Sequence, residues 1–437
     1  MRSKKRNKKK VNRKIAENSV NTNNLNSRNK RNQSSRRTQT RRKIQDDDEN
    51  ENVNDMIRKN KKGLTQEEII KMKKRKIIRW FVIIILLLVL LIMFLVSLYK
   101  WNKIMKDVIK VQNSIVVDST GNVIAVLGET RIQETVSLDK IPQNLVNAYV
   151  SIEDKNFYKH HGINFKRTAG AIGSYILHRG SASYGGSTIT QQLVKNVTGE
   201  NESSISRKMV EWDRAVKTEM VLSKDQIMQT YLNIIYVGPN VYGVEMGSKY
   251  YFNKSVSDLD LAECAFLAGL NHSPNSYNPF GEKDNSEKIK SRSKTVLNVM
   301  LEENYITRDE YDSAVAEIDS GLKFEKGDVK PNGDGVYSYM VDATISEVVE
   351  DLKKKKKMST SFATNYLYFS GLKIYCTQNS DIQKNIEDEF SQKKYMVKSD
   401  KNEDATAQAA MVVIDHSNGQ VKGCVRRIGW KRHIERI

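Results

Sequence analysis

One uninterrupted apolar run dominates the hydrophobic pattern of this chain. Seventeen consecutive apolar residues extend from Trp80 to Val96, and the apolar character continues to Tyr99. Twenty helical residues rise about 30 Å, which matches the hydrocarbon thickness of a bilayer. Trp80, Tyr99 and Trp101 mark the two ends of the run, where amphipathic rings favour the membrane interface. The pattern predicts a single transmembrane helix over residues 80–99.

A cleaved signal peptide is the alternative interpretation of this run. Its apolar region would be shorter, and a small-residue cleavage site would follow it. The chain instead continues with Lys100-Trp-Asn-Lys. We therefore expect the helix to be retained in the protein.

The polar sequence before the apolar run carries almost all of the net charge. Residues 1–79 contain 27 Lys/Arg and 9 Asp/Glu, whereas the rest of the chain contains 45 and 43. The net charges are therefore +18 and +2, out of +20 for the whole chain. The dense basic run predicts a cytoplasmic N-terminus, with everything after Lys100 outside the cell membrane. A nearly neutral body argues against nucleic acid as a partner.

Two segments are expected within the basic tail. Residues 1–62 are rich in Lys, Arg, Asn and Ser and have few apolar side chains, so they cannot bury enough surface to fold. Thr65 and Glu68 then have capping-box spacing. This predicts a short juxtamembrane basic helix within residues 63–79.

Beyond the apolar run, strand patterning gives way to helical patterning. Residues 114–127 form two β-branched runs about Gly121-Asn122, which predicts a small hairpin. Helical spacing then predicts helices leading into Glu153, after Arg207, from Ser223 with Gln226, over 258–270 and over 286–303. The region is expected to be mainly α.

The most polar of the patterned stretches is Gly185–Asn196, with sequence GGSTITQQLVKN. It combines two glycines, three hydroxyl side chains, carboxamides and one lysine. Glycines allow close backbone approach, and hydroxyls, amides and backbone N–H groups can face an oxygen-rich anion. The lysine adds a point charge suited to phosphate. On its own, the stretch is more typical of a polar loop that caps a helix.

Three further motifs accompany this stretch in a fixed order. Glu153–Gly162 has the pattern E-D-x-x-F-Y-x-H-x-G, Arg207–Glu211 has R-K-x-x-E, and Tyr231–Gly238 has Y-L-N-x-x-x-x-G. Together the four motifs resemble the peptidoglycan glycosyltransferase domain of the bifunctional, class A penicillin-binding proteins. The resemblance implies a lysozyme-like α fold. It also implies polymerisation of lipid II into β-1,4 glycan strands, with inversion at the anomeric carbon and release of undecaprenyl pyrophosphate.

The resemblance assigns roles to the two motif carboxylates. Glu153 becomes the base that deprotonates the 4-hydroxyl of the acceptor, a role worth roughly 10²–10⁴-fold in rate. Glu211 becomes the second glutamate, which helps to orient the substrate. The leaving pyrophosphate gathers negative charge, so Lys195, Arg207 and Lys208 are expected to stabilise it.

The wider set of site candidates follows from the same motifs. The candidate substrate-binding residues are Ser187, Thr188, Gln191, Gln192, Lys195, Asn196, Arg207 and Lys208, with His160 and Asn233 as secondary candidates. Phe157 and Tyr158 are interpreted as packing residues of the loop, and Glu219 as an ion-pair partner of Lys217 or Arg214. Two positions depart from the family pattern, since Val210 and Ser203 stand where a Lys and an Arg are usual.

The C-terminal third changes character again. Ser370–Thr377 resembles the linker strand before the family's transpeptidase domain, and 409–423 resembles the opening hairpin of that domain. A serine transpeptidase also needs K-T-G, which is found nowhere in the chain. About 30 residues cannot form such a domain's core. We therefore expect no transpeptidase activity and no acylation by penicillin.

The predicted organisation has six parts. They are a disordered basic tail (1–62), a juxtamembrane basic helix (63–79), a transmembrane helix (80–99), a glycosyltransferase domain (100–309), a small α+β linker region (310–404) and the truncated start of a transpeptidase domain (405–437). The expected partners are lipid II, a lipid-linked glycan chain and the cytoplasmic membrane, with cell-wall synthesis or division proteins as further candidates.

No metal site is predicted from the residues, because His, Cys, Asp and Glu do not cluster with recognisable ligand spacing. The three cysteines, Cys264, Cys376 and Cys424, are scattered. A divalent cation, Mg²⁺ or Mn²⁺, is implied only by the resemblance. Two other functions stay open: a lysozyme-like glycan hydrolase, which would not need a phosphate-binding set, and an inactive scaffold that recruits cell-wall proteins.

Overall fold

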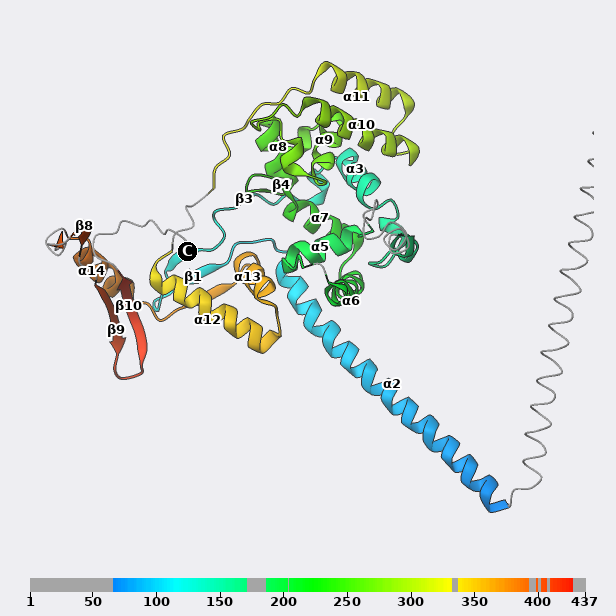
Figure 1. Ribbon diagram of the computed structural model, residues 1–437, viewed down its shortest axis with the longest axis horizontal. Helices are drawn as coiled ribbons and strands as arrows, with labels where there is room; N and C mark the ends of the chain where they lie inside the picture. Colours follow the sequence, from blue (N-terminus) through cyan, green and yellow to red (C-terminus); the bar gives the residue numbers. More distant parts are fainter. Residues whose placement is uncertain are drawn as a thin grey trace, which may run out of the picture. The chain divides into compact units, whose positions relative to one another are not determined.

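The apolar run lies within one long helix, α2, which extends over Gln66–Val108 (Figure 1). A computed structural model describes residues 66–170, 186–202, 204–331, 337–392, 398–399, 402–406 and 409–426. The predictions for residues 1–62 and the capping role of Thr65 lie outside this part of the chain. The expected basic helix and the expected transmembrane helix are thus one continuous helix, which extends nine residues beyond the predicted end at Tyr99.

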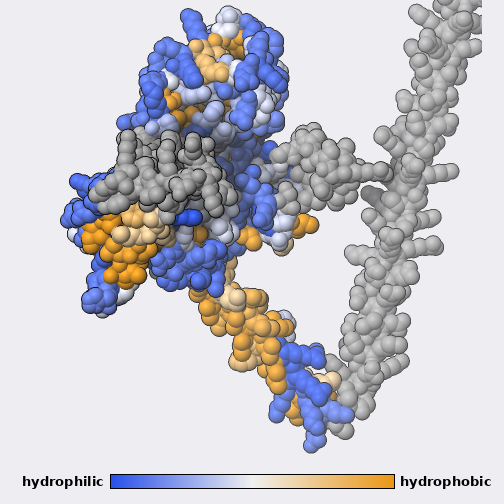
Figure 2. Space-filling view, turned by 60° about the vertical axis from the view of Figure 1, so that its left-hand side comes forward, coloured by the Kyte–Doolittle hydropathy of each residue, from blue (hydrophilic) through white to orange (hydrophobic). Residues whose placement is uncertain are grey.

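The chain divides into two units, Met1–Phe94 and Leu95–Ile437. In the first unit, the apolar side chains of α2 lie on the surface, with Trp80 67% exposed and Leu90 60% exposed. Figure 2 shows this part of the helix as a continuous hydrophobic band. The helix is long and apolar enough to cross a membrane. Burial in lipid would remove this large apolar surface from water.

The end of α2 belongs to the core of the second unit. Trp101, Ile104, Met105 and Val108 are buried, and their spacing places them on one face of the helix. The Trp101 indole N–H donates a hydrogen bond of 2.9 Å to the Thr218 hydroxyl. The last turns of α2 therefore pack as an ordinary core helix.

The predicted hairpin is confirmed and receives a third strand. Strands β1 (Ile115–Val117) and β2 (Val123–Val126) pair antiparallel, and Gly121 supplies the positive φ of +95° in the turn between them. Strand β6 (Lys373–Tyr375) pairs parallel with β1, giving the order β2-β1-β6. The predicted linker strand is therefore part of the same sheet as the N-terminal hairpin.

The body between these strands is helical, which confirms the predicted mainly α class. Its helices are α3 (Gln143–Glu153), α5 (Ile189–Thr198), α6 (Ile205–Val221), α7 (Lys224–Ile234), α8 (Val244–Phe252), α9 (Leu261–Leu270), α10 (Ser286–Glu302) and α11 (Arg308–Ser320). Single turns of 3₁₀-helix occur at Leu138–Lys140, Phe157–Lys159, Val256–Asp258 and Pro274–Tyr277. Helices α3, α9 and α10 pack together (Figure 1), and α9, which is apolar on nearly every side, is almost wholly buried.

A second small sheet and the C-terminal elements complete the fold. Strands β3 (Ile132–Gln133), β5 (Val241–Tyr242) and β4 (Tyr236–Gly238) form a sheet in that order. The C-terminal elements are α12 (Tyr339–Lys356), α13 (Thr360–Phe369), α14 (Ser380–Phe390), β7 (Lys398–Ser399), β8 (Asn402–Thr406), β9 (Ala410–Asp415) and β10 (Gln420–Arg426). β9 and β10 pair antiparallel, as predicted for the hairpin after residue 409. The domain boundary expected after residue 309 falls inside α11.

Candidate active site

Hydrogen bonds join the motif Glu153–Gly162 to the motif Gly185–Asn196. The Asp154 carboxylate, which is fully buried, accepts hydrogen bonds from His160 Nε2 at 2.8 Å and from the Ile189 N–H at 3.1 Å. The Thr188 hydroxyl donates to the Gly162 carbonyl at 2.7 Å. Residues that are far apart in the chain are thereby fixed against each other. His160 thus lies in the junction of the two loops.

The polar stretch forms a loop that begins a helix, as its composition allowed. Thr188 caps α5: its hydroxyl accepts from the Gln191 N–H, and the Gln191 side chain accepts from the Thr188 N–H at 2.7 Å. This reciprocal arrangement satisfies two backbone donors at the helix start. Both side chains are buried. Thr188 and Gln191 therefore shape the loop that carries the other candidates.

Glu153 ends α3 and is held by uncharged donors. Its Oε2 accepts from Gln192 Nε2 at 2.7 Å, and its Oε1 accepts from Asn271 Nδ2 at 3.0 Å. The Tyr231 hydroxyl donates to Gln192 Oε1 at 3.0 Å and accepts from Asn271 at 3.0 Å. These four side chains form a closed network around the carboxylate. No cation is paired with Glu153 among the residues that the structure describes.

Tyr231 is the buried member of this network. Burial raises the pKa of its hydroxyl well above the usual value, and the nearby Glu153 charge raises it further. The hydroxyl therefore remains a donor at neutral pH. It keeps the Gln192 amide oriented with its N–H toward Glu153.

Asn271 was not among the residues predicted from the sequence. It follows directly after α9, in a stretch whose Asn, Ser and Pro residues are typical of any helix-terminating turn. Its role arises from a contact with Glu153 that spans 118 positions in the chain. The Asn after an apolar helix was a weak signal, and only the tertiary structure brings it to the carboxylate.

Glu211 is buried and held by cations. Its Oε2 accepts from Arg207 at 2.7 Å, and its Oε1 accepts from the Lys208 ammonium. The same Lys208 ammonium donates to the Ser187 hydroxyl at 2.9 Å. All four residues were predicted for the site, and the structure brings them together. The charge of Glu211 is thereby balanced by two basic side chains on the first turns of α6.

One short segment links the two glutamates. Ser187 lies immediately before the residue that caps α5 and contacts the Glu211 cluster, which consists of Glu211, Arg207 and Lys208. Gln192, in the first turn of α5, contacts Glu153. The positive end of the α5 helix dipole also favours negative charge. The arrangement can therefore hold an anionic group beside a carboxylate whose oxygens accept hydrogen bonds from amides.

The last predicted candidates lie elsewhere. Lys195 and Asn196 are exposed and line a cavity near the end of α5. Asn233 is buried, and its amide bonds with both backbone groups of Val136 at 2.8 Å. Those bonds place Asn233 in the framework of the domain. Ser203 lies outside the described residues.

Some expected partners differ in the structure. Glu219 is paired with Lys224 at 2.7 Å and with the Thr190 hydroxyl, so the predicted pairing with Lys217 or Arg214 is wrong. Phe157 is fully buried as expected, whereas Tyr158 is 50% exposed. Val210 is also exposed, at 42%.

The donor set around the glutamates does not fit a divalent cation. Such ions require carboxylate or carbonyl oxygens that are free to coordinate. Both oxygens of Glu211 accept hydrogen bonds from cationic side chains, and both oxygens of Glu153 accept from amides. Within the described ranges, no group of three His, Cys, Asp or Glu residues could hold a metal ion.

Comparison with known families agrees with this geometry. Residues 120–301 match the family model of the transglycosylase domain. This range includes Glu153, Gln192, Glu211 and Asn271. Residues 120–301 therefore form a transglycosylase domain of the type found in class A penicillin-binding proteins.

The chain is similar to several proteins named penicillin-binding protein 1A. It is 40% identical over 320 residues to that of Clostridium botulinum (strain Langeland), covering 71% of this chain and 38% of the relative. It is 36% identical over 371 residues to that of Clostridium perfringens (strain 13), covering 80% and 54%. The chain thus spans about two fifths to one half of these relatives.

Among solved structures, the crystal structure of penicillin-binding protein 1A from Haemophilus influenzae matches with a TM-score of 0.26 and 21% identity. The match covers 66% of this chain and 33% of that one. A superposition at this score does not establish a shared fold.

Proposed function

We propose that this chain is a membrane-anchored peptidoglycan glycosyltransferase that polymerises lipid II, with Glu153 as its general base. The observation that carries the assignment is the contrast between the two glutamates. Glu211 is neutralised by Arg207 and Lys208, whereas Glu153 is held by the neutral amides of Gln192 and Asn271. A general base takes up a proton on a carboxylate oxygen, and proton uptake by Glu211 would break its contacts with two cationic side chains.

The proposed step is a single displacement. Glu153 takes the proton from the acceptor 4-hydroxyl as that oxygen bonds to the anomeric carbon of the donor. The bond from this carbon to the pyrophosphate breaks at the same time, with inversion, and its electron pair leaves with undecaprenyl pyrophosphate. Lys208, Arg207 and Ser187 lie together and would stabilise the charge on that group. Glu211 orients these cations.

A test uses the full chain in detergent with labelled lipid II. The wild type should make long glycan strands that lysozyme digests, and Glu153→Gln should lower turnover by at least about 10²-fold. Glu302→Gln is the matched control, because this glutamate is 67% exposed and its only partner in the described part of the chain is Lys155 at 3.5 Å. If Glu153→Gln keeps more than about a tenth of wild-type turnover, Glu153 is not the base. Hydrolysis of finished glycan without strand synthesis would favour the hydrolase alternative.

A further inference from the structure

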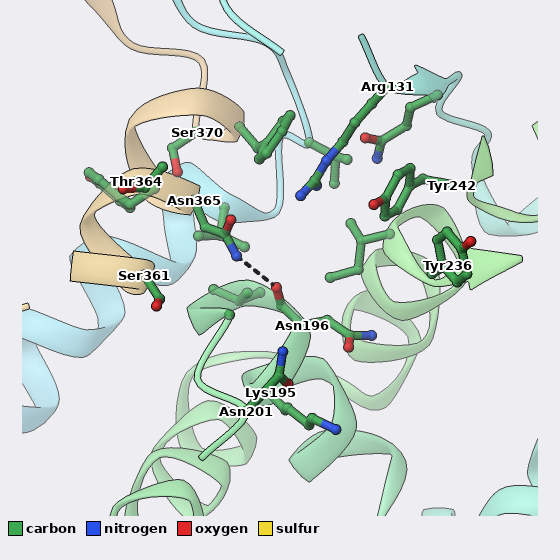
Figure 3. A pocket seen from close by; sticks show the side chains of 18 of the residues that line it. Arg131, Lys195, Asn196, Asn201, Tyr236, Tyr242, Ser361, Thr364, Asn365 and Ser370 are labelled. Carbon is green, nitrogen blue, oxygen red and sulfur yellow. Dashed lines mark hydrogen bonds between the residues drawn. The ribbon is translucent and has the colours of Figure 1, made fainter. Parts of the chain in front are cut away.

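A second potential ligand site is a cavity of about 570 Å³ between the catalytic domain and the C-terminal helices (Figure 3). Its walls come from the end of α5, from the β3-β5-β4 sheet and from α13. The lining residues that decide its chemistry include Arg131, Lys195, Asn196, Tyr242, Thr364 and Asn365. Neither glutamate of the proposed active site lines it.

The lining of this cavity is positively charged. It contains two cations, Arg131 and Lys195, and no carboxylate among the described residues. The Arg131 guanidinium lies 3.6 Å from the Phe369 ring centroid and 4.4 Å from that of Tyr242. Figure 3 shows its nitrogen atoms reaching into the cavity. A partly desolvated guanidinium is costly without an anion, and its planar fork matches a carboxylate or a phosphate.

The rest of the lining suits a sugar. Amides of Asn196, Asn201 and Asn365 and hydroxyls of Ser361 and Thr364 offer both donors and acceptors. Tyr236, which lies across the cavity from Thr364 and Asn365 in Figure 3, adds an aromatic side chain. Ligand sites typically combine such side chains with a few fixed polar groups. A plain inorganic anion would use the cations and leave most of this lining without a partner.

The cavity is also connected to the proposed active site through α5. Lys195 and Asn196 lie three and four residues after Gln192, which holds Glu153. Positions three and four apart share one face of a helix and are separated by about one turn, or 5.4 Å. A ligand in the cavity would therefore begin about one helical turn from the catalytic network.

We propose that this cavity binds a sugar–peptide unit of the glycan through a carboxylate of its peptide, at a distance from the sugar that reacts. This inference rests on the proposed function. The carboxylate pairs with the Arg131 fork, and the sugar contacts the amides and hydroxyls of α5 and α13. Because α13 lies C-terminal to the matched domain, the linker region contributes directly to glycan binding. The site would hold a growing strand in place between additions.

The experiment measures binding by calorimetry to the full chain in detergent, without turnover. The probes are a soluble disaccharide-peptide with free carboxylates, the same molecule with its carboxylates amidated, and inorganic pyrophosphate. Arg131→Met removes the charge while keeping an apolar side chain of similar length, and Thr364→Trp fills the cavity from α13. Arg308→Met is the matched control, because Arg308 also lies over a ring, that of Tyr311 at 5.1 Å, but outside the cavity.

We expect the free disaccharide-peptide to bind at least about tenfold more weakly to Arg131→Met and to Thr364→Trp, and normally to Arg308→Met. Amidation should cause a similar loss. Unchanged binding to both cavity variants would overturn the proposal, as would tight binding of pyrophosphate alone, which would indicate a phosphate site. The disaccharide-peptide should still bind to Glu153→Gln, because Glu153 does not line the cavity. Polymerisation of lipid II by the wild type tests the proposed function separately.

Discussion

Replacing Asp154 with Asn tests whether the junction between the two loops holds Glu153, the proposed general base. The Asp154 side chain is fully buried, and one of its oxygens accepts from both His160 and the Ile189 N–H. Hydrogen bonds to a charged group contribute about 1.5–3 kcal/mol, and neutral ones about 0.5–1.5. Loss of the charge should therefore cost about 1 kcal/mol for each of the two bonds.

The new amide adds a second cost. Asp154 Oδ1 is buried and has no hydrogen-bond partner among the described residues, so an NH₂ group placed there would be an unsatisfied donor. Such a group costs about 1–3 kcal/mol. The expected loss of unfolding free energy is about 3–5 kcal/mol, which is the range for removing one partner of a buried pair.

The assay is urea unfolding of the full chain in detergent, with tryptophan fluorescence as the measure of unfolding. Asp312→Asn is the control, because its partner Arg308 and Asp312 itself are both more than half exposed, and such pairs contribute about 0–1 kcal/mol. Under conditions where the variant is folded, Asp154→Asn should also lower kcat at least about tenfold with little change in KM, because Glu153 would be misplaced. A loss below about 1 kcal/mol with normal kcat would refute this reasoning.

Four further predictions follow from other contacts. Gly162→Ala should destabilise the protein by more than about 1 kcal/mol in urea unfolding, because Gly162 has φ +89° and an added Cβ would lie 2.7 Å from the Ala215 backbone; an unchanged midpoint would contradict the close approach. Lys208→Met should raise KM and lower kcat for lipid II together, since it removes a cation from the Glu211 cluster; a normal kcat/KM would argue against phosphate stabilisation there. Stability should fall as pH rises above about 10, since the raised pKa of Tyr231 keeps its proton in the folded state after the unfolded chain has lost it; unfolding from pH 8 to 11 should show a smaller slope for Tyr231→Phe. Protease added to intact spheroplasts should digest the domain after the apolar helix and spare the basic tail; protection of that domain would reverse the topology.

The motifs predicted which residues of the candidate site lie together better than how these residues are arranged. Glu153, Glu211, Arg207 and Lys208 follow from local patterns, and their spacing on α6 already allows the i,i+3 and i,i+4 contacts of Glu211. The same reasoning failed for Glu219. Its predicted partners lie on the same helix, whereas its real partner is Lys224, beyond the end of α6 at the start of α7. Intrahelical spacing does not account for side chains near a helix end, where the next element competes.

Tertiary contacts account for what the sequence pattern could not supply. Asn271 and Tyr231 reach Glu153 and Gln192 only because α7 and the end of α9 lie beside α5 in the fold. Neither residue type is unusual in its local context. The cavity beside Arg131 is similar in origin, because its lining comes from segments more than 200 positions apart. No periodicity in the sequence indicates such a convergence.

Helix α5 connects the candidate active site with the cavity beside Arg131. Its apolar positions, Ile189, Leu193, Val194 and Val197, are buried in the core and fix the helix rigidly. The polar positions that remain are divided along its length. Ser187, just before the helix, contacts Lys208, which is paired with Glu211, and Gln192 in the first turn contacts Glu153. Lys195 and Asn196, near the end of the helix, line the cavity. A substrate that contacts all of them must be elongated and must carry negative charge near the helix start and again near its end. A lipid-linked glycan chain, with pyrophosphate at its reacting sugar and carboxylates further along, has this distribution of charge.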